Sequence, residues 1–252
     1  MNATFQNQPV AAEILTDVLD PDDAGSAAEP RNPPEEAVWV GGSSAQEIAL
    51  LADPTGRQSE ATRALRTHIL TSHRQRGRRA LVVCAASRGE GCTGVAVNLA
   101  VALRQAGLKV LLIDADLRNP SLHHYFPAAL GAPGLHERLL APETPLTRSI
   151  VRDAATGLSI MPAGKVTTDA PNLLFGDRLK PVLDVCQREF DATIIDTPPA
   201  NSCSDARLIS SIAGYSLIVA KRDASFLGDV KTLAEELRRA NAHVVGAVLN
   251  DA

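Results

Sequence analysis

Three aspartates follow short apolar runs of the kind that form buried strands. Asp114 and Asp116 come after the run Val110–Ile113. Asp196 follows the run Thr193–Ile195. Carboxylate oxygens suit Mg²⁺, and a carboxylate beside the metal can also accept a proton from an attacking hydroxyl. Because ligand sites of open α/β sheets lie at the carboxyl ends of the parallel strands, the sequence predicts magnesium binding and nucleophile activation by these aspartates.

A glycine-rich turn precedes the first of these aspartates. It joins an expected strand, Leu81–Cys84, to an expected helix, Val95–Arg104. Such a turn directs backbone N–H groups and the positive end of a helix dipole at a phosphate. In the template G-x-x-x-x-G-K-[ST], Ala86 takes the first position, Gly91 the second glycine, and Thr93 the magnesium-binding hydroxyl. The residues expected to contact a bound nucleotide are Ser87, Arg88, Gly89, Glu90, Gly91, Cys92, Thr93 and Gly94.

Cys92 occupies the position of the lysine in that template. A lysine about 4 Å from a phosphate charge, at an effective dielectric constant of about 20, contributes about 4 kcal/mol, on the order of a thousandfold in binding or rate. A neutral thiol supplies none of this. Arg88 lies in the same turn, and its guanidinium is a candidate for partial compensation. A thiol at a helix N-terminus can also have a lowered pKa and respond to oxidants, which is a second interpretation of Cys92.

Strands alternate with helices along the rest of the chain. After Asp196 come Ser216–Ala220, then a helical pattern over Phe226–Ala240, then Val244–Leu249, which ends at Asn250. This alternation predicts an α/β, P-loop NTPase-like fold of three layers, with a mostly parallel sheet and helices on both faces. Only 3 % of the residues are aromatic, so the core is expected to be aliphatic.

The first 44 residues differ from the rest in composition and charge. They contain eight acidic residues and one arginine, a net charge of −7. The whole chain has a net charge of −4, so the remaining residues carry +3. We therefore expect a disordered acidic tail at residues 1–44 and one phosphate-loop domain at residues 45–252. An acidic tail on a nearly neutral domain argues against nucleic acid as a partner.

Neither the apolar runs nor the N-terminal segment indicates a membrane protein. No run approaches the ~18 apolar residues of a membrane span, and the N-terminus lacks a basic start followed by an apolar stretch. The four cysteines form no C-x-x-C pair, which is typical of reduced cytosolic thiols. We expect a cytoplasmic protein that reaches a membrane only through a partner.

Several segments together resemble the bacterial tyrosine kinases of capsule and exopolysaccharide assembly. They are GEGCT at Gly89–Thr93, VNLA at Val97–Ala100, LLIDADLRNPSLH at Leu111–His123, and IIDTPPANSCSDA at Ile194–Ala206. A further element, Glu60-x-x-Arg63-x-x-Arg66, stands where that family has its subunit-contact motif, on a helix that we expect Ser59 to cap. The resemblance covers Ser59 to the C-terminus, and it extends to stand-alone cytoplasmic modules that pair with a membrane chain-length determinant.

The resemblance implies ATP and Mg²⁺ as cofactors and a tyrosine hydroxyl as acceptor. Thr93, Asp114 and Asp196 would organise Mg²⁺. Asp114 or Asp116 would accept the hydroxyl proton, and the sequence does not decide between them. Arg118 and Asn250 would contact the nucleotide, Asn250 at its adenine. Glu60, Arg63 and Arg66 would reach a neighbouring subunit in a homo-oligomeric ring.

The family also implies where the protein acts and where this chain departs from its relatives. The expected partner is a polysaccharide co-polymerase, the membrane chain-length determinant, which would hold the protein at the inner face of the membrane. The family's autokinases usually carry a C-terminal tyrosine cluster, whereas the tyrosines here are Tyr125 and Tyr215, and Tyr215 opens an expected buried strand. Self-phosphorylation on a flexible tail is therefore not expected.

Three functions remain open at this point. The first is a tyrosine kinase whose phosphotransfer is weakened by Cys92. The second is a non-catalytic, nucleotide-binding scaffold of a polysaccharide co-polymerase. The third is a partition-type ATPase, which ranks last because that class normally carries a second lysine at the start of its loop (K-G-G-x-G-K-T), where this chain has Ser87-Arg88-Gly89.

Overall fold

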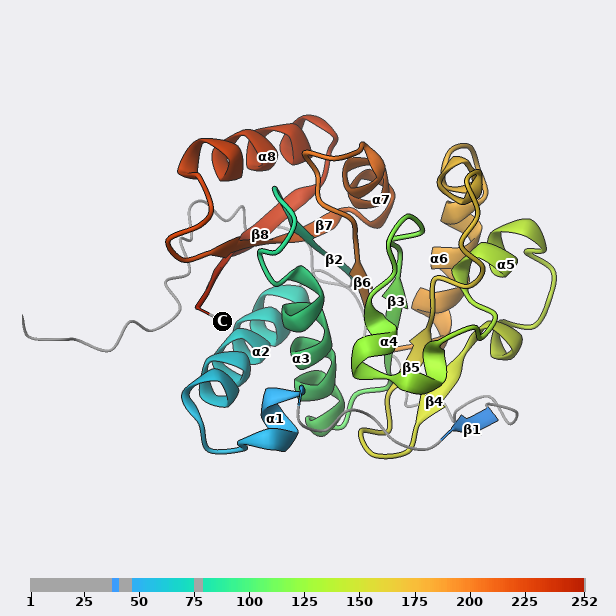
Figure 1. The fold of residues 1–252 in the computed structure, drawn as a ribbon, viewed down its shortest axis with the longest axis horizontal. Coiled ribbons are helices and arrows are strands. Elements are labelled where there is room, and N and C mark those ends of the chain that lie inside the picture. The colour runs from blue at the N-terminus through green and yellow to red at the C-terminus, as the bar shows by residue number, and fades with distance from the viewer. Residues whose placement is uncertain (1–37, 41–46, 75–78, 252) are drawn as a thin grey trace, which may run out of the picture.

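The computed structural model describes residues 38–40, 47–74 and 79–251. Within them, eight strands form one sheet in the order β1-β4-β5-β3-β6-β2-β7-β8 (Figure 1). Neighbouring strands are parallel except for the antiparallel pair β4–β5. The strands are β1 (Val38–Val40), β2 (Ala80–Ala85), β3 (Val110–Asp114), β4 (Val151–Asp153), β5 (Ser159–Met161), β6 (Ala192–Asp196), β7 (Tyr215–Lys221) and β8 (His243–Asn250).

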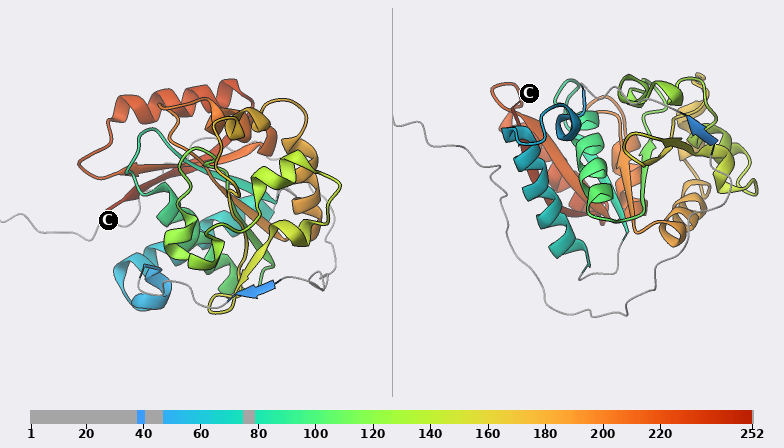
Figure 2. Two further views of the ribbon diagram at one scale, coloured as in Figure 1. Left: turned by 45° about the vertical axis from the view of Figure 1, so that its right-hand side comes forward. Right: turned by 90° about the horizontal axis from the view of Figure 1, so that it is seen from below.

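Helices cover both faces of the sheet. They are α1 (Ala49–Ala52), α2 (Arg57–Arg74), α3 (Cys92–Gln105), α4 (Leu122–Tyr125), α5 (Leu135–Leu140), α6 (Leu179–Glu189), α7 (Asp205–Ala213) and α8 (Leu227–Arg239). Short 3₁₀ turns lie at Pro127–Ala129, Leu146–Ser149 and Ala170–Leu174. In the left view of Figure 2 the sheet lies between the red helix α8 and the blue and teal helix α2. The three-layer, P-loop NTPase-like fold is confirmed.

The two faces of the sheet have separate aliphatic cores. Along β2, Leu81 and Val83 pack with α1 to α4, while Val82 and Cys84 pack with α5 to α8. Each of these strand residues is at most 1 % exposed. A strand buried on both faces reads as a continuous apolar run, which is the pattern that the sequence shows there.

The starts of α2 and α3 differ from the sequence prediction. Helix α3 begins at Cys92, three residues before the expected Val95. Helix α2 begins at Arg57, so Ser59 lies inside its first turn and does not cap it. The Ser59 hydroxyl instead donates a hydrogen bond to the backbone carbonyl of Asp53, at 2.7 Å, and ties α2 to the chain before it. Of the expected tail, residues 38–40 form β1, in parallel register with β4; residues 1–37 and 41–44 lie outside the described residues.

Strand register brings the predicted site together. Asp196 at the end of β6 is the partner of Asp114 on β3 and of Val83 on β2. The loop between β2 and α3 therefore faces the ends of β6 and β3 directly. Along the part of the chain that the structure describes, no helix combines the length and the apolarity needed to cross a membrane.

Candidate functional site

The turn between β2 and α3 has the backbone that a phosphate-binding loop requires. Gly89 and Gly91 have φ values of 82° and 87°, a region that residues with a side chain rarely adopt. Gly91 is the N-cap of the 14-residue helix α3. A Cβ atom on Gly91 would overlap the side-chain amide of Asn250. The loop thus ends in free backbone N–H groups at a helix N-terminus, the geometry that binds anions.

Glu90 is part of this loop, and its carboxylate is buried and bonded within the chain. It is 4 % exposed and accepts hydrogen bonds from the backbone N–H of Ser87, at 2.9 Å, and from the Ser225 hydroxyl. The Asn250 side-chain amide donates to the Glu90 backbone carbonyl at 3.1 Å. Asn250 therefore lies against the phosphate loop, and its predicted contact with adenine stays a prediction.

The hydroxyl of Thr93, which the sequence predicts to bind magnesium, lies near Ser121 and Asp196. Thr93 Oγ1 is 2.9 Å from Ser121 Oγ, and it is also close enough to Asp196 to lower the pKa of that carboxyl. Sequence reasoning missed Ser121, because a serine before a four-residue helix has no spacing that marks it. It also missed Tyr125 on α4, whose hydroxyl lies 3.1 Å from the position that a Cβ on Gly94 would take. Burial raises the pKa of Tyr125, with the carboxylates of Glu47 and Asp196 adding to the effect.

The carboxylates of β3 and β6 are buried side by side. Burial, together with the charges of Asp196 and Asp116, raises the pKa of Asp114 to about 8, although backbone N–H donors act in the opposite direction. Burial also raises the pKa of Asp196, to about 6. Asp196 Oδ1 has no hydrogen-bond donor among the described residues. Each shift reports that negative charge at this edge is costly without a positive partner.

A divalent cation fits this arrangement of donors. No three His, Cys, Asp or Glu side chains in the described part of the chain are close enough to hold a metal by themselves. Mg²⁺ commonly takes one or two carboxylates and fills its octahedron with water and phosphate oxygens. Thr93, Asp114 and Asp196 suit such a site, in which a magnesium ion would offset the repulsion between the carboxylates.

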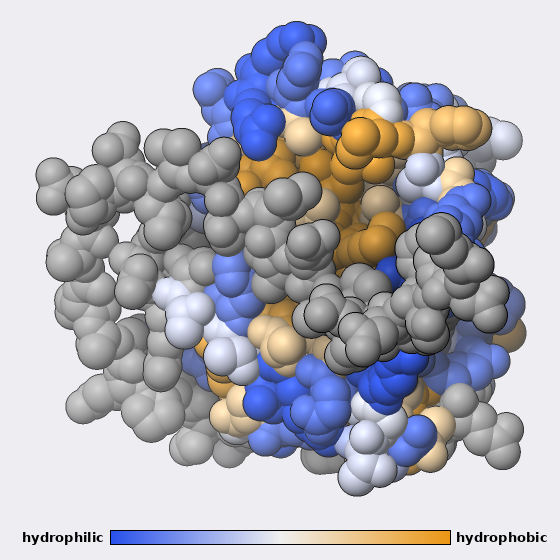
Figure 3. All heavy atoms as spheres, turned by 90° about the vertical axis from the view of Figure 1, so that its left-hand side faces the viewer, coloured by the Kyte–Doolittle hydropathy of each residue, from blue (hydrophilic) through white to orange (hydrophobic). Residues whose placement is uncertain are grey.

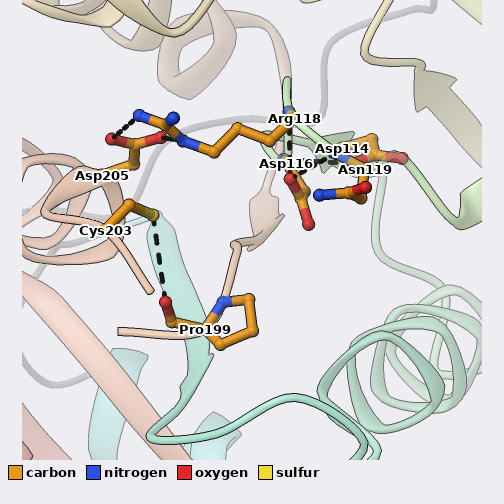
Figure 4. Close-up of polar contacts among 7 residues, drawn as sticks. All are labelled: Asp114, Asp116, Arg118, Asn119, Pro199, Cys203 and Asp205. Atoms are coloured by element: carbon orange, nitrogen blue, oxygen red, sulfur yellow. Dashed lines mark hydrogen bonds and ion pairs between the residues drawn. The ribbon is translucent and has the colours of Figure 1, made fainter. Parts of the chain in front are cut away.

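Asp116 is oriented by the turn that follows β3. Its Oδ1 atom accepts the backbone N–H groups of Arg118 and Asn119, at 3.0 Å and 2.8 Å (Figure 4). The guanidinium of Arg118 forms two hydrogen bonds with Asp205, the first residue of α7, at 2.8 Å and 3.2 Å. Asp205 is fully buried. Arg118 is thus held by an ion pair within the chain, and its predicted contact with the nucleotide stays a prediction.

Cys92 points back under the loop. Its thiol donates to the backbone carbonyl of Val83 at 3.2 Å. Burial raises the pKa of Cys92 well above its usual value, and the nearby Asp196 carboxylate raises it further. The interpretation of Cys92 as an oxidant-sensitive thiol with a lowered pKa is therefore wrong, because the effect of the helix N-terminus is outweighed by desolvation and a neighbouring negative charge. Arg88 is exposed on the outer side of the same turn.

The predicted subunit-contact residues lie apart from this site, on α2. Glu60 and Arg63 form an ion pair one turn apart on the helix surface, and Glu60 is 66 % exposed. Arg66 is partly exposed one turn further on. The structure thus brings together Thr93, Asp114, Asp116 and Asp196, and it leaves the three α2 residues available on a separate surface.

Comparison with known proteins agrees with this geometry. The sequence profile of the AAA domain family matches residues 79–245. The tyrosine-protein kinase Etk of Escherichia coli is 32 % identical over 198 residues, 79 % of this chain and 27 % of Etk. The CapB protein of Staphylococcus aureus is 28 % identical over 78 % of this chain and 86 % of its own length. The solved kinase domain of Escherichia coli Etk superposes with a TM-score of 0.77 at 27 % identity, over 85 % of this chain and 89 % of that domain.

The chain spans about a quarter of the length of the first curated relatives that it matches. The matched region contains the glycine loop and the aspartates of β3 and β6, which carry the site geometry. The chain therefore belongs to the AAA domain family and is a homologue of the bacterial tyrosine kinases.

Proposed function

We propose that the protein is an ATP- and Mg²⁺-binding tyrosine kinase of exopolysaccharide or capsule assembly, with phosphotransfer weakened by Cys92. The single observation that carries the proposal is the convergence of a glycine loop with Thr93, Asp114 and Asp196 at adjoining strand ends. This pairing of anion-binding backbone with acidic side chains is the requirement for a magnesium–triphosphate complex. The similarity to Etk supports tyrosine as the acceptor.

The side chains divide into metal-holding and proton-accepting roles. Mg²⁺, when bound, would neutralise charge on the transferring phosphoryl group. Asp114 accepts backbone N–H groups on both carboxylate oxygens, from Asp116, Ser121 and Leu122, so its orientation is fixed. Asp116 uses one oxygen in this way. Its second oxygen is not used in this way, and this makes Asp116 the better candidate to accept the proton of a tyrosine hydroxyl.

The loop supplies less positive charge than a kinase of this kind usually has. Cys92 lies on the Val83 carbonyl and brings no cation to the phosphates. Arg118 is engaged with Asp205, so Arg88 on the exposed rim is the candidate for compensation. A guanidinium that must be recruited from solvent replaces a fixed ammonium only in part, because ordering the side chain costs conformational entropy.

A second candidate function is a non-catalytic scaffold, which the placement of Cys92 favours. In that case the protein binds ATP–Mg²⁺ and changes its association state without transferring phosphate. Both candidates place the protein in the cytoplasm beside a polysaccharide co-polymerase. In both, Glu60, Arg63 and Arg66 contact a second copy in a homo-oligomer, and nucleic acid is not a partner.

The experiment compares the natural chain with Cys92→Lys and with Cys92→Met, which adds length without charge. ATP–Mg²⁺ affinity is measured by calorimetry, and transfer is measured from γ-labelled ATP to a tyrosine-containing peptide. We expect weak binding and slow transfer in the natural chain, and a gain of roughly tenfold to a thousandfold in Cys92→Lys alone. ATP–Mg²⁺ binding without phosphotransfer, in the natural chain and in Cys92→Lys alike, identifies the scaffold. Absence of nucleotide binding in Cys92→Lys would refute the phosphate-loop assignment.

A further inference from the structure

The phosphate loop is held from behind by two other segments of the chain. Glu90 has its carboxylate on the Ser225 hydroxyl and its backbone carbonyl on the Asn250 side-chain amide. Ser225 belongs to the turn between β7 and α8, and Asn250 is the last residue of β8. We refer to Glu90, Ser225 and Asn250 as the loop clamp. Ser225 and Asn250 lie 135 and 160 residues after Glu90 in the sequence.

The turn that carries Ser225 depends on these polar contacts for its position. The Ser225 hydroxyl also accepts the backbone N–H of Lys221 at 2.7 Å, and the backbone N–H of Arg222 donates to the Asn250 carbonyl at 2.8 Å. The next residues, Phe226 and Leu227, are 77 % and 66 % exposed. Figure 3 shows apolar residues gathered on this side of the molecule. Because those two side chains stand in solvent, core packing at this point does not hold the turn in place.

The same contacts fix the conformation of the loop. The Glu90 carboxylate accepts the Ser87 N–H across the turn at 2.9 Å, so a single side chain closes the loop and ties it to Ser225. The Asn250 amide fills the space beside Gly91 that a Cβ atom would take. A carboxylate in a phosphate loop would repel a triphosphate if it faced the ligand. Here the clamp turns that charge inward and gives it two hydrogen-bond donors.

We propose that Ser225 and Asn250 are positioning residues, which hold the phosphate loop in its anion-binding conformation before a nucleotide arrives. The proposal rests on the proposed function for the identity of the ligand. Because this loop has no lysine, a bound phosphate has fewer charge interactions with which to order it. The loop clamp therefore orders part of the loop in advance of binding.

The test measures hydrogen exchange of the Ala85–Gly94 backbone in the full chain, without ligand, together with ATP–Mg²⁺ affinity. The variants are Ser225→Ala, Ser225→Thr and Asn250→Ala. The matched control is Ser211→Ala, which removes an exposed hydroxyl that donates to the Leu208 carbonyl within α7. We expect Ser225→Ala to accelerate exchange and to raise the dissociation constant about tenfold, as for loss of a hydrogen bond to a charged group. Ser225→Thr, which keeps the hydroxyl, should restore both.

Each outcome decides the proposal. Exchange in Ser225→Ala and Asn250→Ala equal to that in Ser211→Ala overturns it. Faster exchange with unchanged ATP affinity overturns the positioning role. A natural chain that binds no ATP refutes the proposed function, whereas exchange in the ligand-free chain still decides the clamp. If either Ser225→Ala or Asn250→Ala melts well below the control, the comparison uses the other of these two variants.

Discussion

The glycine loop and the carboxylate edge face each other across one site, yet the structure supports them differently. At the loop, both carboxylate oxygens and the backbone carbonyl of Glu90 have partners within the chain, and Cys92 stands in place of the usual lysine. At the edge of β3 and β6, Asp114 and Asp196 crowd negative charge together, and Asp196 Oδ1 has no donor among the described residues. The Glu90 carboxylate is satisfied by contacts within the chain, whereas burial and a neighbouring negative charge raise the pKa of both carboxylates at the edge.

This difference predicts opposite responses to substitution. On the carboxylate edge, removing a charge should lower ligand affinity but relieve repulsion in the free protein. At the loop, removing a contact should lower affinity and stability together. The predictions below either sharpen this contrast or remove it, from the largest expected effect to the smallest.

Asp196→Asn should lower ATP affinity in the presence of Mg²⁺ by about a hundredfold, because a carboxylate that organises the metal is lost. The same substitution should leave the metal-free protein as stable as the natural chain or more stable, since it removes a buried charge beside Asp114. Calorimetry with and without Mg²⁺ and urea unfolding of the metal-free protein measure the two effects. A loss of both affinity and stability would make the two regions alike.

Asp205→Ala should lower the free energy of unfolding by about 2 kcal/mol. It removes the buried partner of Arg118, whose guanidinium is partly exposed and can regain water in compensation. Urea unfolding measures the change, and Lys180→Ala, which removes an exposed pair with Asp184, is the control. If Asp205→Ala behaved like the control, the ion pair would not anchor the turn that orients Asp116.

The metal-free protein should lose stability as the pH rises from about 4 to 8. The folded pKa of Asp114 is about 8 and that of Asp196 about 6, both above the ordinary value of 3.8. The folded state therefore binds more protons than the unfolded state in this range, and stability falls by up to about 1.4 kcal/mol per pH unit for one proton. Unfolding titrations of the natural chain and Asp114→Asn measure it. The variant should show a shallower slope; equal slopes would mean that Asp114 titrates normally.

Arg63→Ala should have the smallest effect on folding, below about 0.5 kcal/mol, because its pair with Glu60 lies on an exposed helix surface. Light scattering with ATP–Mg²⁺ present measures its effect on association. Under the proposal, the variant associates less than Lys180→Ala does. Equal association in the two variants would remove α2 from the subunit contact.

The fold and the placement of the aspartates at adjoining strand ends followed from local sequence patterns. Buried parallel strands read as apolar runs, and Asp114 and Asp196 stand at the ends of two of them, so strand register alone brings them together. The glycines of the loop could also be predicted from the sequence, since Gly89 and Gly91 have backbone angles that few other residues adopt.

Long-range polar contacts did not follow from the sequence. Asp205 and Ser225 pair with residues 87 and 135 positions away, and no spacing rule connects them. The direction of the Cys92 side chain was equally hidden, because it depends on how deeply the loop is buried against Val83 and Asp196. The start of α2 was misplaced at Ser59, since a serine inside a first turn looks the same in sequence as a serine that caps one.

The most direct test of the account is calorimetric titration of the natural chain with ATP, first with Mg²⁺ and then with EDTA at the same ionic strength. The account predicts measurable binding with Mg²⁺ and a loss of at least about tenfold in EDTA, because the carboxylate edge accepts the nucleotide only together with its cation. Affinity that is equal in the two titrations, or no binding in either, would contradict it.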